Sequence, residues 1–220
     1  PVADLVKAGP NAGGTQTVQI PVLGSTSHRD TTTGGVRLRP LTTGSSRVTA
    51  SVPGFLQVTS AGGSTVTVTQ PSITVNAGTV GSGLQDGASG SLGASNHGGV
   101  TVRLVSGSPN LLLAPNASTL GGSTLDIAVP PNQTSFFYVV QALEGQTGTT
   151  PVTVQASAPG FAAGSGTINL VQGAIDLTGV PANTTTLTPS SALTVRTGIP
   201  NSQTTPAFLT QLQAVRAGAP

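Results

Sequence analysis

The sequence predicts an all-β protein built from β-sandwich domains in tandem. Apolar and polar residues alternate in short runs bounded by glycine, proline, asparagine or serine, a pattern typical of half-buried strands. Segments also recur at a near-constant spacing, which indicates a tandem array. That spacing is close to the roughly 100 residues of one β-sandwich domain and far longer than a solenoid repeat.

Two pairs of segments define the repeat. Ala-Ser-Val-Pro-Gly-Phe at residues 50–55 returns as Ala-Ser-Ala-Pro-Gly-Phe at residues 156–161, which is 106 residues later. Gly-Gly-Thr at residues 13–15 matches Gly-Gly-Ser at residues 121–123, at a spacing of 108. In Pro-Gly-Phe, proline presets φ for a turn, glycine takes the positive φ that follows, and phenylalanine can cap a core. The motif therefore predicts a turn and carries no chemistry of its own.

The composition excludes several classes of protein. Charged residues are only 6% of the chain, against about 25% in an ordinary globular protein, yet the alternating valines and threonines favour a folded β chain over disorder. A net charge of +2 over 220 residues makes no basic patch, so we expect no nucleic-acid partner. Cysteine is absent, which excludes disulfides and thiolate metal sites. No apolar run is long enough to cross a bilayer, so we expect no membrane insertion.

The individual strands follow from the alternation. Residues 136–140 are apolar on both faces and predict a central or interface strand. Residues 208–215 have apolar residues at helical spacing, but their counterpart one repeat earlier is a clear strand, so a strand is predicted there too. The other predicted strands include residues 17–22, 65–69, 100–104, 125–129, 152–155 and 168–170.

The phase of the repeat sets the predicted domains. Pro1, Pro109 and Pro220 hold the same phase, inside a domain. Residues 1–72 are therefore predicted to be the C-terminal part of one sandwich, residues 73–172 a complete sandwich, and residues 173–220 the N-terminal part of the next.

A partial sandwich would expose an apolar face and unpaired strand edges. Because the chain also begins without methionine, we expect it to be a piece of something longer. Either it is a window on a longer array, or its parts complete each other between copies by strand complementation.

Three segments resemble bacterial immunoglobulin-like repeats: residues 99–106, residues 130–139 and residues 148–161. The resemblance implies tandem immunoglobulin-like sandwiches of the kind that build the stalks of large secreted and cell-surface proteins, including invasin-type adhesins. It therefore also implies an extracellular or cell-surface location. The chain departs from the antibody-type pattern because it has neither tryptophan nor a cysteine pair.

The sequence offers no catalytic, cofactor-binding or metal-binding residues. His28 and Asp30 are two residues apart in a polar segment that is best interpreted as a hairpin loop, and His97 is predicted to be solvated in a flexible loop. Acidic residues are scattered singly, and no calcium-loop spacing occurs. We therefore expect no enzyme activity and no cofactor.

Two sets of residues remain as candidates for surface roles. The sequons at Asn116, Asn132 and Asn183 are candidate glycosylation sites. Phe136 and Tyr138 are candidate surface aromatics for ligand contact, with core packing as the alternative interpretation.

The sequence thus leads to a hypothesis of a non-catalytic structural repeat in a bacterial extracellular fibre, stalk or filament. Its expected partners are neighbouring repeats or copies of the same protein, as in a homopolymer. The alternative is an adhesin or carbohydrate-binding module that contacts host or matrix glycans.

Overall fold

The computed structural model describes residues 3–7, 14–15, 36–49, 51, 53–56, 63–148 and 150–219. Every secondary-structure element in these residues is a β-strand, so the predicted all-β class is confirmed. None of the described segments forms a helix long and apolar enough to cross a membrane. The chain divides into two compact units, residues 1–70 and residues 71–220.

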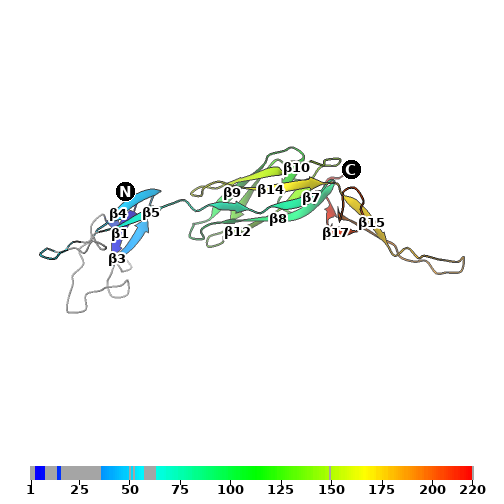
Figure 1. Ribbon diagram of the computed structural model, residues 1–220, viewed down its shortest axis with the longest axis horizontal. Helices are drawn as coiled ribbons and strands as arrows, with labels where there is room; N and C mark the ends of the chain where they lie inside the picture. The colour runs from blue at the N-terminus through cyan, green and yellow to red at the C-terminus, as the bar shows by residue number, and fades with distance from the viewer. Residues whose placement is uncertain are drawn as a thin grey trace. The chain divides into compact units, whose positions relative to one another are not determined.

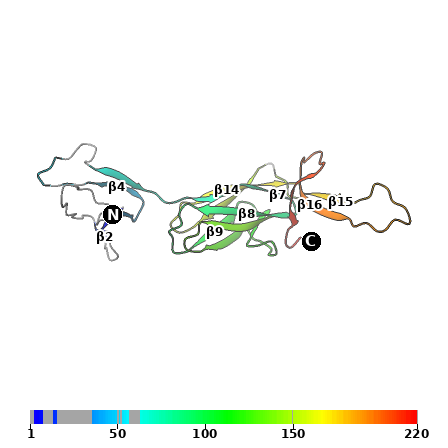
Figure 2. The same ribbon diagram turned by 90° about the horizontal axis from the view of Figure 1, so that it is seen from below.

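The first part of the second unit is a sandwich of two β-sheets (Figures 1 and 2). One sheet has the order β10-β12-β8, with β6 also paired to β8, and the other has the order β11-β9-β13-β14-β7. The strands of the first sheet are β6 (Ile73–Val75), β8 (Leu84–Leu92), β10 (Leu111–Ala114) and β12 (Ser135–Ala142). Those of the second are β7 (Gly78–Gly81), β9 (Val100–Ser106), β11 (Thr124–Val129), β13 (Val152–Ser157) and β14 (Gly164–Val171).

The chain crosses between the two sheets at its entry to the sandwich. β6 pairs antiparallel with β8, with Ile73 opposite Leu92. Only two residues separate β6 from β7, which pairs parallel with β14 on the other sheet, with Gly78 opposite Ile168. One short segment therefore supplies an outer strand to each of the two sheets.

The core lies between the two sheets and is aliphatic apart from two aromatic rings. Alternation along the strands places every second side chain inward, as the sequence predicts. Burial of one such leucine or valine side chain stabilises the fold by about 1.5–3 kcal/mol. Side chains that are no more than 2% exposed include Val80, Val102, Leu104, Leu111, Leu113, Phe136, Tyr138, Val140, Val154 and Ile168.

β12 confirms one prediction and corrects another. It lies between β10 and β8, so its predicted central position is confirmed. However, Phe136 and Tyr138 are each 2% exposed, whereas Phe137 is 73% exposed. Only one face of this part of β12 packs on the core, although the residues of both faces are apolar. Gly90 lies opposite Phe136, and a Cβ there would stand 2.2 Å from the phenylalanine ring, so only glycine leaves room for that ring.

The C-terminal region begins with a separate three-stranded antiparallel sheet. Its order is β15 (Ala174–Thr178), β16 (Thr194–Pro200) and β17 (Leu209–Leu212). The chain then returns to the sandwich, where β18 (Ala214–Val215) pairs antiparallel with the start of β8. The strand predicted at residues 208–215 is therefore confirmed, in two short pieces separated by the buried Gln213.

The first unit contains two small antiparallel sheets. One has the order β2-β1-β3, formed by β1 (Ala3–Lys7), β2 (Gly14–Thr15) and β3 (Val36–Pro40). The other is the pair β4 (Gly44–Val48) and β5 (Ser64–Val68). Among the residues of this unit whose exposure is described (38–49, 51, 53–56 and 63–70), none is fully buried. The predicted strand at residues 17–22 and the pair His28 and Asp30 lie outside the described residues.

The pairings of the first unit follow the same order as those of β10 to β14. β1 pairs antiparallel with β3 and with β2, as β10 pairs antiparallel with β12 and forms a bridge to Gly122. β4 then pairs with β5 as β13 pairs with β14. The division into units falls after Gln70, close to one predicted domain seam, whereas the predicted boundaries at residues 72 and 172 stay predictions.

Candidate functional site

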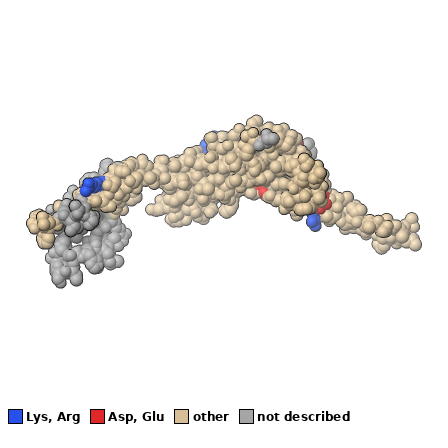
Figure 3. All heavy atoms as spheres, in the orientation of Figure 1, with Lys and Arg blue, Asp and Glu red and all other residues tan. Residues whose placement is uncertain are grey.

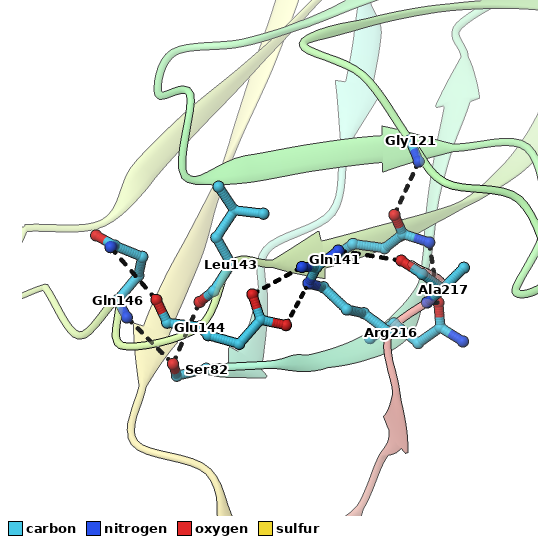
Figure 4. A network of polar contacts seen from close by, with 9 residues as sticks. Ser82, Gly121, Gln141, Leu143, Glu144, Gln146, Arg216 and Ala217 are labelled. Atoms are coloured by element: carbon cyan, nitrogen blue, oxygen red, sulfur yellow. Dashed lines mark hydrogen bonds and ion pairs between the residues drawn. The ribbon is translucent and has the colours of Figure 1, made fainter. Parts of the chain in front are cut away.

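A cluster of polar side chains anchors the C-terminal segment to one end of the sandwich (Figure 4). Arg216, which follows β18, is 8% exposed. Its Nε and Nη2 donate to the two carboxylate oxygens of Glu144, at 2.8 and 2.7 Å. Its backbone N–H donates to the carbonyl of Gly83, in the turn between β7 and β8, at 3.1 Å. Paired hydrogen bonds of this kind fix the orientation of the guanidinium as well as adding energy.

Glu144 lies in the turn after β12, and its side chain is 43% exposed. The hydrogen bond from Arg216 lowers the pKa of this carboxyl. Partial desolvation acts in the opposite direction but does not outweigh it. Glu144 is therefore ionised at neutral pH and keeps its ion pair until the solution is clearly acidic.

Two buried glutamines form the centre of the cluster. Gln141 is fully buried, and its Nε2 donates to Gln85 Oε1 and to the Thr119 carbonyl, both at 2.9 Å. Its Oε1 accepts from the Gly121 N–H at 2.9 Å. Gln85 Oε1 also accepts from the Ala217 N–H, at 3.3 Å. These bonds attach both the loop after β10 and the C-terminal segment to β8 and β12, and they satisfy side chains that would be costly to bury unpaired.

Gln213 closes the same end of the sandwich from the other side of β18. Its side chain is 5% exposed. The Oε1 accepts from the Gly81 N–H at 2.9 Å, and the Nε2 donates to the Thr79 carbonyl at 2.9 Å and to Asp86 Oδ2 at 3.1 Å. The segment after β17 thus makes hydrogen bonds to both β7 and β8, one strand of each sheet.

The hydrogen bonds of this cluster hold the chain's own C-terminal segment against the sandwich. Ser82 Oγ donates to the Leu143 carbonyl at 3.2 Å and accepts from the Gln146 N–H at 3.1 Å, so its hydroxyl is engaged with backbone. The remaining groups are amides, the ion pair of Arg216 and Glu144, and the carboxylate of Asp86, and several of them hold backbone groups in place. A shallow, open groove lies elsewhere, beside Val105 and Gln155, and its lining holds no ionisable side chain. Within the described ranges, no three histidine or acidic residues gather as metal ligands would.

His97 lies in a loop and is partly exposed, and its ring is held there by contacts with other loops. Its Nε2 lies 2.8 Å from the Gln133 carbonyl, and its Nδ1 lies 3.3 Å from the Gly99 N–H. Because the Gly99 N–H can only donate, these partners assign the proton to Nε2. The ring also contacts Phe161 edge-on, with centroids 5.9 Å apart. The side chain joins three loops at the end of the sandwich opposite the β7–β8 turn, and its contacts with the described residues are to two backbone groups and one aromatic ring.

All three sequon asparagines lie at the surface. Asn116 begins a turn in which its Oδ1 accepts from the N–H of Ser118 at 3.0 Å and from the hydroxyls of Ser118 and Thr119 at 2.9 Å. Asn132 has a φ of 65° in the turn between β11 and β12. Asn183 is exposed in the long connection between β15 and β16. Their exposure is compatible with glycosylation, which stays a prediction.

The two candidate surface aromatics, Phe136 and Tyr138, lie in the core, so a role for either in surface contact is wrong. Their rings stack with centroids 6.4 Å apart. Burial raises the pKa of the Tyr138 hydroxyl to about 12, and this hydroxyl has no hydrogen-bond partner among the described residues. The inward and outward sides of β12 alternate, so the exposed ring is that of Phe137.

Sequence reasoning missed the polar cluster. Glu144 is the single glutamate of the chain, and Arg216 is the last of its few basic residues. In a chain with 6% charged residues, that scarcity was a signal that each charge has a specific partner. Gln141 gave a second signal, because it directly follows the apolar run of β12. Their pairing across more than 70 residues was not readable from local patterns.

The chain has no match among known protein families or curated proteins. No family model matches the sequence, and a search of curated proteins finds no relative.

Proposed function

We propose that the chain is a non-catalytic structural repeat of a bacterial extracellular or cell-surface fibre, in which immunoglobulin-like sandwiches assemble end to end with neighbouring repeats or copies. The observation that carries the proposal is that the pairings β1–β3 and β4–β5 of the first unit match the pairings β10–β12 and β13–β14 of the second. That agreement, together with the two Pro-Gly-Phe segments, supports a chain made of repeating sandwiches.

The order of strands supports an immunoglobulin-like sandwich. In that fold, four strands A, B, E and D share one sheet, and C, F and G share the other. β6, β8, β12 and β10 have the order A-B-E-D, and β9, β13 and β14 have the order C-F-G. β11 is an additional strand beside β9, and the step from β6 to β7 places the first strand on both sheets.

The surface also suits a structural role. Figure 3 shows a surface on which charged side chains are few and scattered, and the described residues contain no group of three histidine or acidic residues that could hold a metal ion. Uncharged surfaces rich in threonine and serine allow neighbouring domains to approach without repulsion between like charges.

Electron microscopy of the native material tests the proposal. We expect fibres whose axial repeat corresponds to one or two sandwich domains, and sedimentation of the chain that depends on its concentration. Compact monomers that stay monomeric at high concentration would overturn the polymer version of the proposal.

One observation favours the alternative of a carbohydrate-binding module. Phe137 is 73% exposed on β12, and its cross-strand neighbour Ser89 is small, so the ring is accessible to the flat face of a sugar. Binding on a glycan array that is lost in Phe137→Ala but kept in Leu120→Ala, which changes another exposed apolar residue, would support this alternative. An array without binding for the unaltered chain would reject it.

A further inference from the structure

One face of the C-terminal sheet exposes three aliphatic side chains. Ile175, Leu177 and Val195 are 73%, 50% and 65% exposed. Leu177 lies directly opposite Val195, and Ile175 is two residues from Leu177 on the same strand, so the three side chains share a face. β15 is also an edge strand, because its one partner among the described strands is β16.

The sandwich contains the same arrangement with its apolar face covered. β6 is paired antiparallel with β8, as β15 is with β16. Ile73, Val75 and Leu92 share a face there, but they are 4%, 5% and 3% exposed. The sequences agree as well, since Ile-Thr-Val at residues 73–75 corresponds to Ile-Asp-Leu at residues 175–177.

The sandwich also shows what covers such a pair of strands. Ala162, which directly follows the second Pro-Gly-Phe turn, lies against the free edge of β6. The Ile73 N–H donates to the Ala162 carbonyl at 3.1 Å, and the Ala162 N–H donates to the Pro71 carbonyl at 2.9 Å. β13 and β14 pack over the apolar face of β6. The cover is therefore a hairpin together with the Pro-Gly-Phe turn that connects its strands.

The first unit contains the matching hairpin, whose described apolar side chains are exposed or only half-buried. Leu56 holds the place of Ala162 after the first Pro-Gly-Phe turn and is fully exposed, and Phe55 is 77% exposed. Val66 and Val68 of β5 hold the places of Ile168 and Leu170 but are only half-buried. Among the described residues, no hydrogen bond to the backbone of Leu56 occurs.

We propose that β15 and β16 of one copy pack against β4, β5 and the first Pro-Gly-Phe turn of a second copy, completing a sandwich between the two chains. By analogy with β6, the Leu56 N–H donates to the Gly173 carbonyl of the other copy, and the Ile175 N–H donates to the Leu56 carbonyl. Ile175, Leu177 and Val195 then become core residues. This inference rests on the proposed function and specifies the interface through which copies assemble.

A second copy fits the exposed face in chemistry as well as in pattern. Ile175, Leu177 and Val195 carry no charge, nor do Val66 and Val68 on the opposing hairpin, so closure would bury no unpaired ion. Asp176 and Arg196 lie directly opposite each other in register. Their positions alternate with those of the aliphatic residues, so their side chains stay on the solvent face.

Two neighbouring substitutions on β16 test the interface by sedimentation velocity of the full chain. Val195→Asp places a charge on the aliphatic face, and Thr194→Asp places the same charge on the opposite face of the same strand. We expect Val195→Asp to weaken self-association at least about tenfold and Thr194→Asp to leave it unchanged. Both side chains are exposed, so the sandwich itself should fold in both variants, which the fluorescence of the single tyrosine, Tyr138, verifies. Equal association of the two variants would overturn the interface.

Cysteine cross-linking tests the register, since the natural chain has no cysteine. By analogy with the pairing of Ser72 and Ala162, residue 56 of one copy lies opposite residue 174 of the other. A mixture of Leu56→Cys and Ala174→Cys chains should form a disulfide-linked heterodimer under mild oxidation. A mixture of Leu56→Cys with Leu187→Cys, at a 92% exposed position, should not.

The outcomes separate this interface from the proposed function. Fibres that form equally well from Val195→Asp, with no specific heterodimer, would overturn the interface and leave the structural role intact. A chain that carries both Leu56→Cys and Ala174→Cys and closes its disulfide as a monomer in dilute solution would overturn the second copy as occupant. Absence of any self-association in the unaltered chain would overturn both proposals.

Discussion

The hairpins β13–β14 and β4–β5 have the same pairing and the same turn motif but very different burial. The glycines of their Pro-Gly-Phe turns have φ values of 81° at Gly160 and 82° at Gly54. Ile168 on β14 is fully buried, whereas Val66 at the matching place on β5 is only half-buried. The turn glycines therefore have the same conformation in the two hairpins, and what differs is how far the strands bury their apolar side chains.

This difference separates two contributions to the fold. The turn and the register depend on a few residues, because proline and glycine preset the backbone and the alternation sets the facing side. Burial depends on strands that come from far along the chain. An isolated two-stranded hairpin is only marginally stable in water. The strands β4 and β5 are therefore paired as in a sandwich, but they gain little of the stability that burial gives to β13 and β14.

The largest expected effect comes from truncating the matched core residues of the two hairpins. Ile168→Ala should lower the free energy of unfolding of the sandwich by about 3 kcal/mol, because it leaves a cavity beside fully buried neighbours. Val66→Ala should cost less than about 1 kcal/mol, because its side chain is already partly in water. Denaturant unfolding followed by Tyr138 fluorescence measures the first, and hydrogen exchange of residues 64–68 measures the second.

Similar effects of Val66→Ala and Ile168→Ala would contradict the difference in burial between the two hairpins. If Val66→Ala reduces protection in β5 as strongly as Ile168→Ala destabilises the sandwich, β5 is covered in solution. Repeating the exchange measurement at low and high protein concentration then shows whether the cover comes from another copy.

The next effect concerns the cluster of hydrogen-bonded polar side chains around Gln141, on the outer side of β12. Gln141→Leu removes the acceptor of the Gly121 N–H and the donor to Gln85 Oε1. We expect the sandwich to lose about 2 kcal/mol of unfolding free energy, because buried polar groups are left without partners. Gln155→Leu is the matched control on the exposed face of β13 and should change the same quantity by less than about 0.5 kcal/mol. A similar loss in both variants would show that the cluster adds nothing specific.

A smaller effect should be equal in the two hairpins. Gly160→Ala and Gly54→Ala each place a Cβ on a residue with positive φ, and in neither case does the Cβ meet an atom within 4 Å. The cost is therefore backbone strain alone, about 1 kcal/mol in each hairpin. Denaturant unfolding followed by Tyr138 fluorescence measures the cost of Gly160→Ala, and hydrogen exchange in β5 measures the cost of Gly54→Ala. If only one of the two substitutions lowered stability, the two turns would have different conformations in solution.

The sequence predicted the parts of the fold that depend on local pattern. The strands containing Val102, Ile127 and Val154 were found from alternation, and the two turns were found from Pro-Gly-Phe. Core packing of Phe136 and Tyr138 was the alternative interpretation and is confirmed, but the exposure of Phe137 was not predicted, because an apolar run on a central strand does not show which of its faces is covered. The return of the chain through β18 to β8 was also not predicted, because its pairing spans more than 120 residues.

The candidate site was the least predictable part of the molecule. Amides such as those of Gln85, Gln141 and Gln213 are common on protein surfaces, and nothing in their local sequence marks them as buried. Their burial depends on loop and C-terminal segments that approach only in the folded chain. The predicted polar segment at His28 and Asp30 lies outside the described residues, so the hairpin loop expected there stays a prediction.

The smallest effect concerns the ion pair that holds the C-terminal segment, and it depends on pH. The pKa of Glu144 is lower in the folded chain than its ordinary value of 4.5, so the pair contributes stability above about pH 4.5. That contribution is lost as the pH falls through the lower, folded pKa. We expect the Arg216 amide, which donates to the Gly83 carbonyl, to lose protection by up to about fivefold on acidification, since partly exposed pairs contribute about 1 kcal/mol or less.

Hydrogen exchange, corrected for the intrinsic pH dependence of the amide, measures this loss, and Glu144→Gln should abolish the acid step while lowering protection at neutral pH. Asp126→Asn, which removes the exposed pair with Arg103, is the matched control and should leave the step in place. An acid step that persists in Glu144→Gln would show that it does not come from this ion pair. The segment that returns from the C-terminal sheet to the sandwich would then be held by its amides rather than by its ion pair.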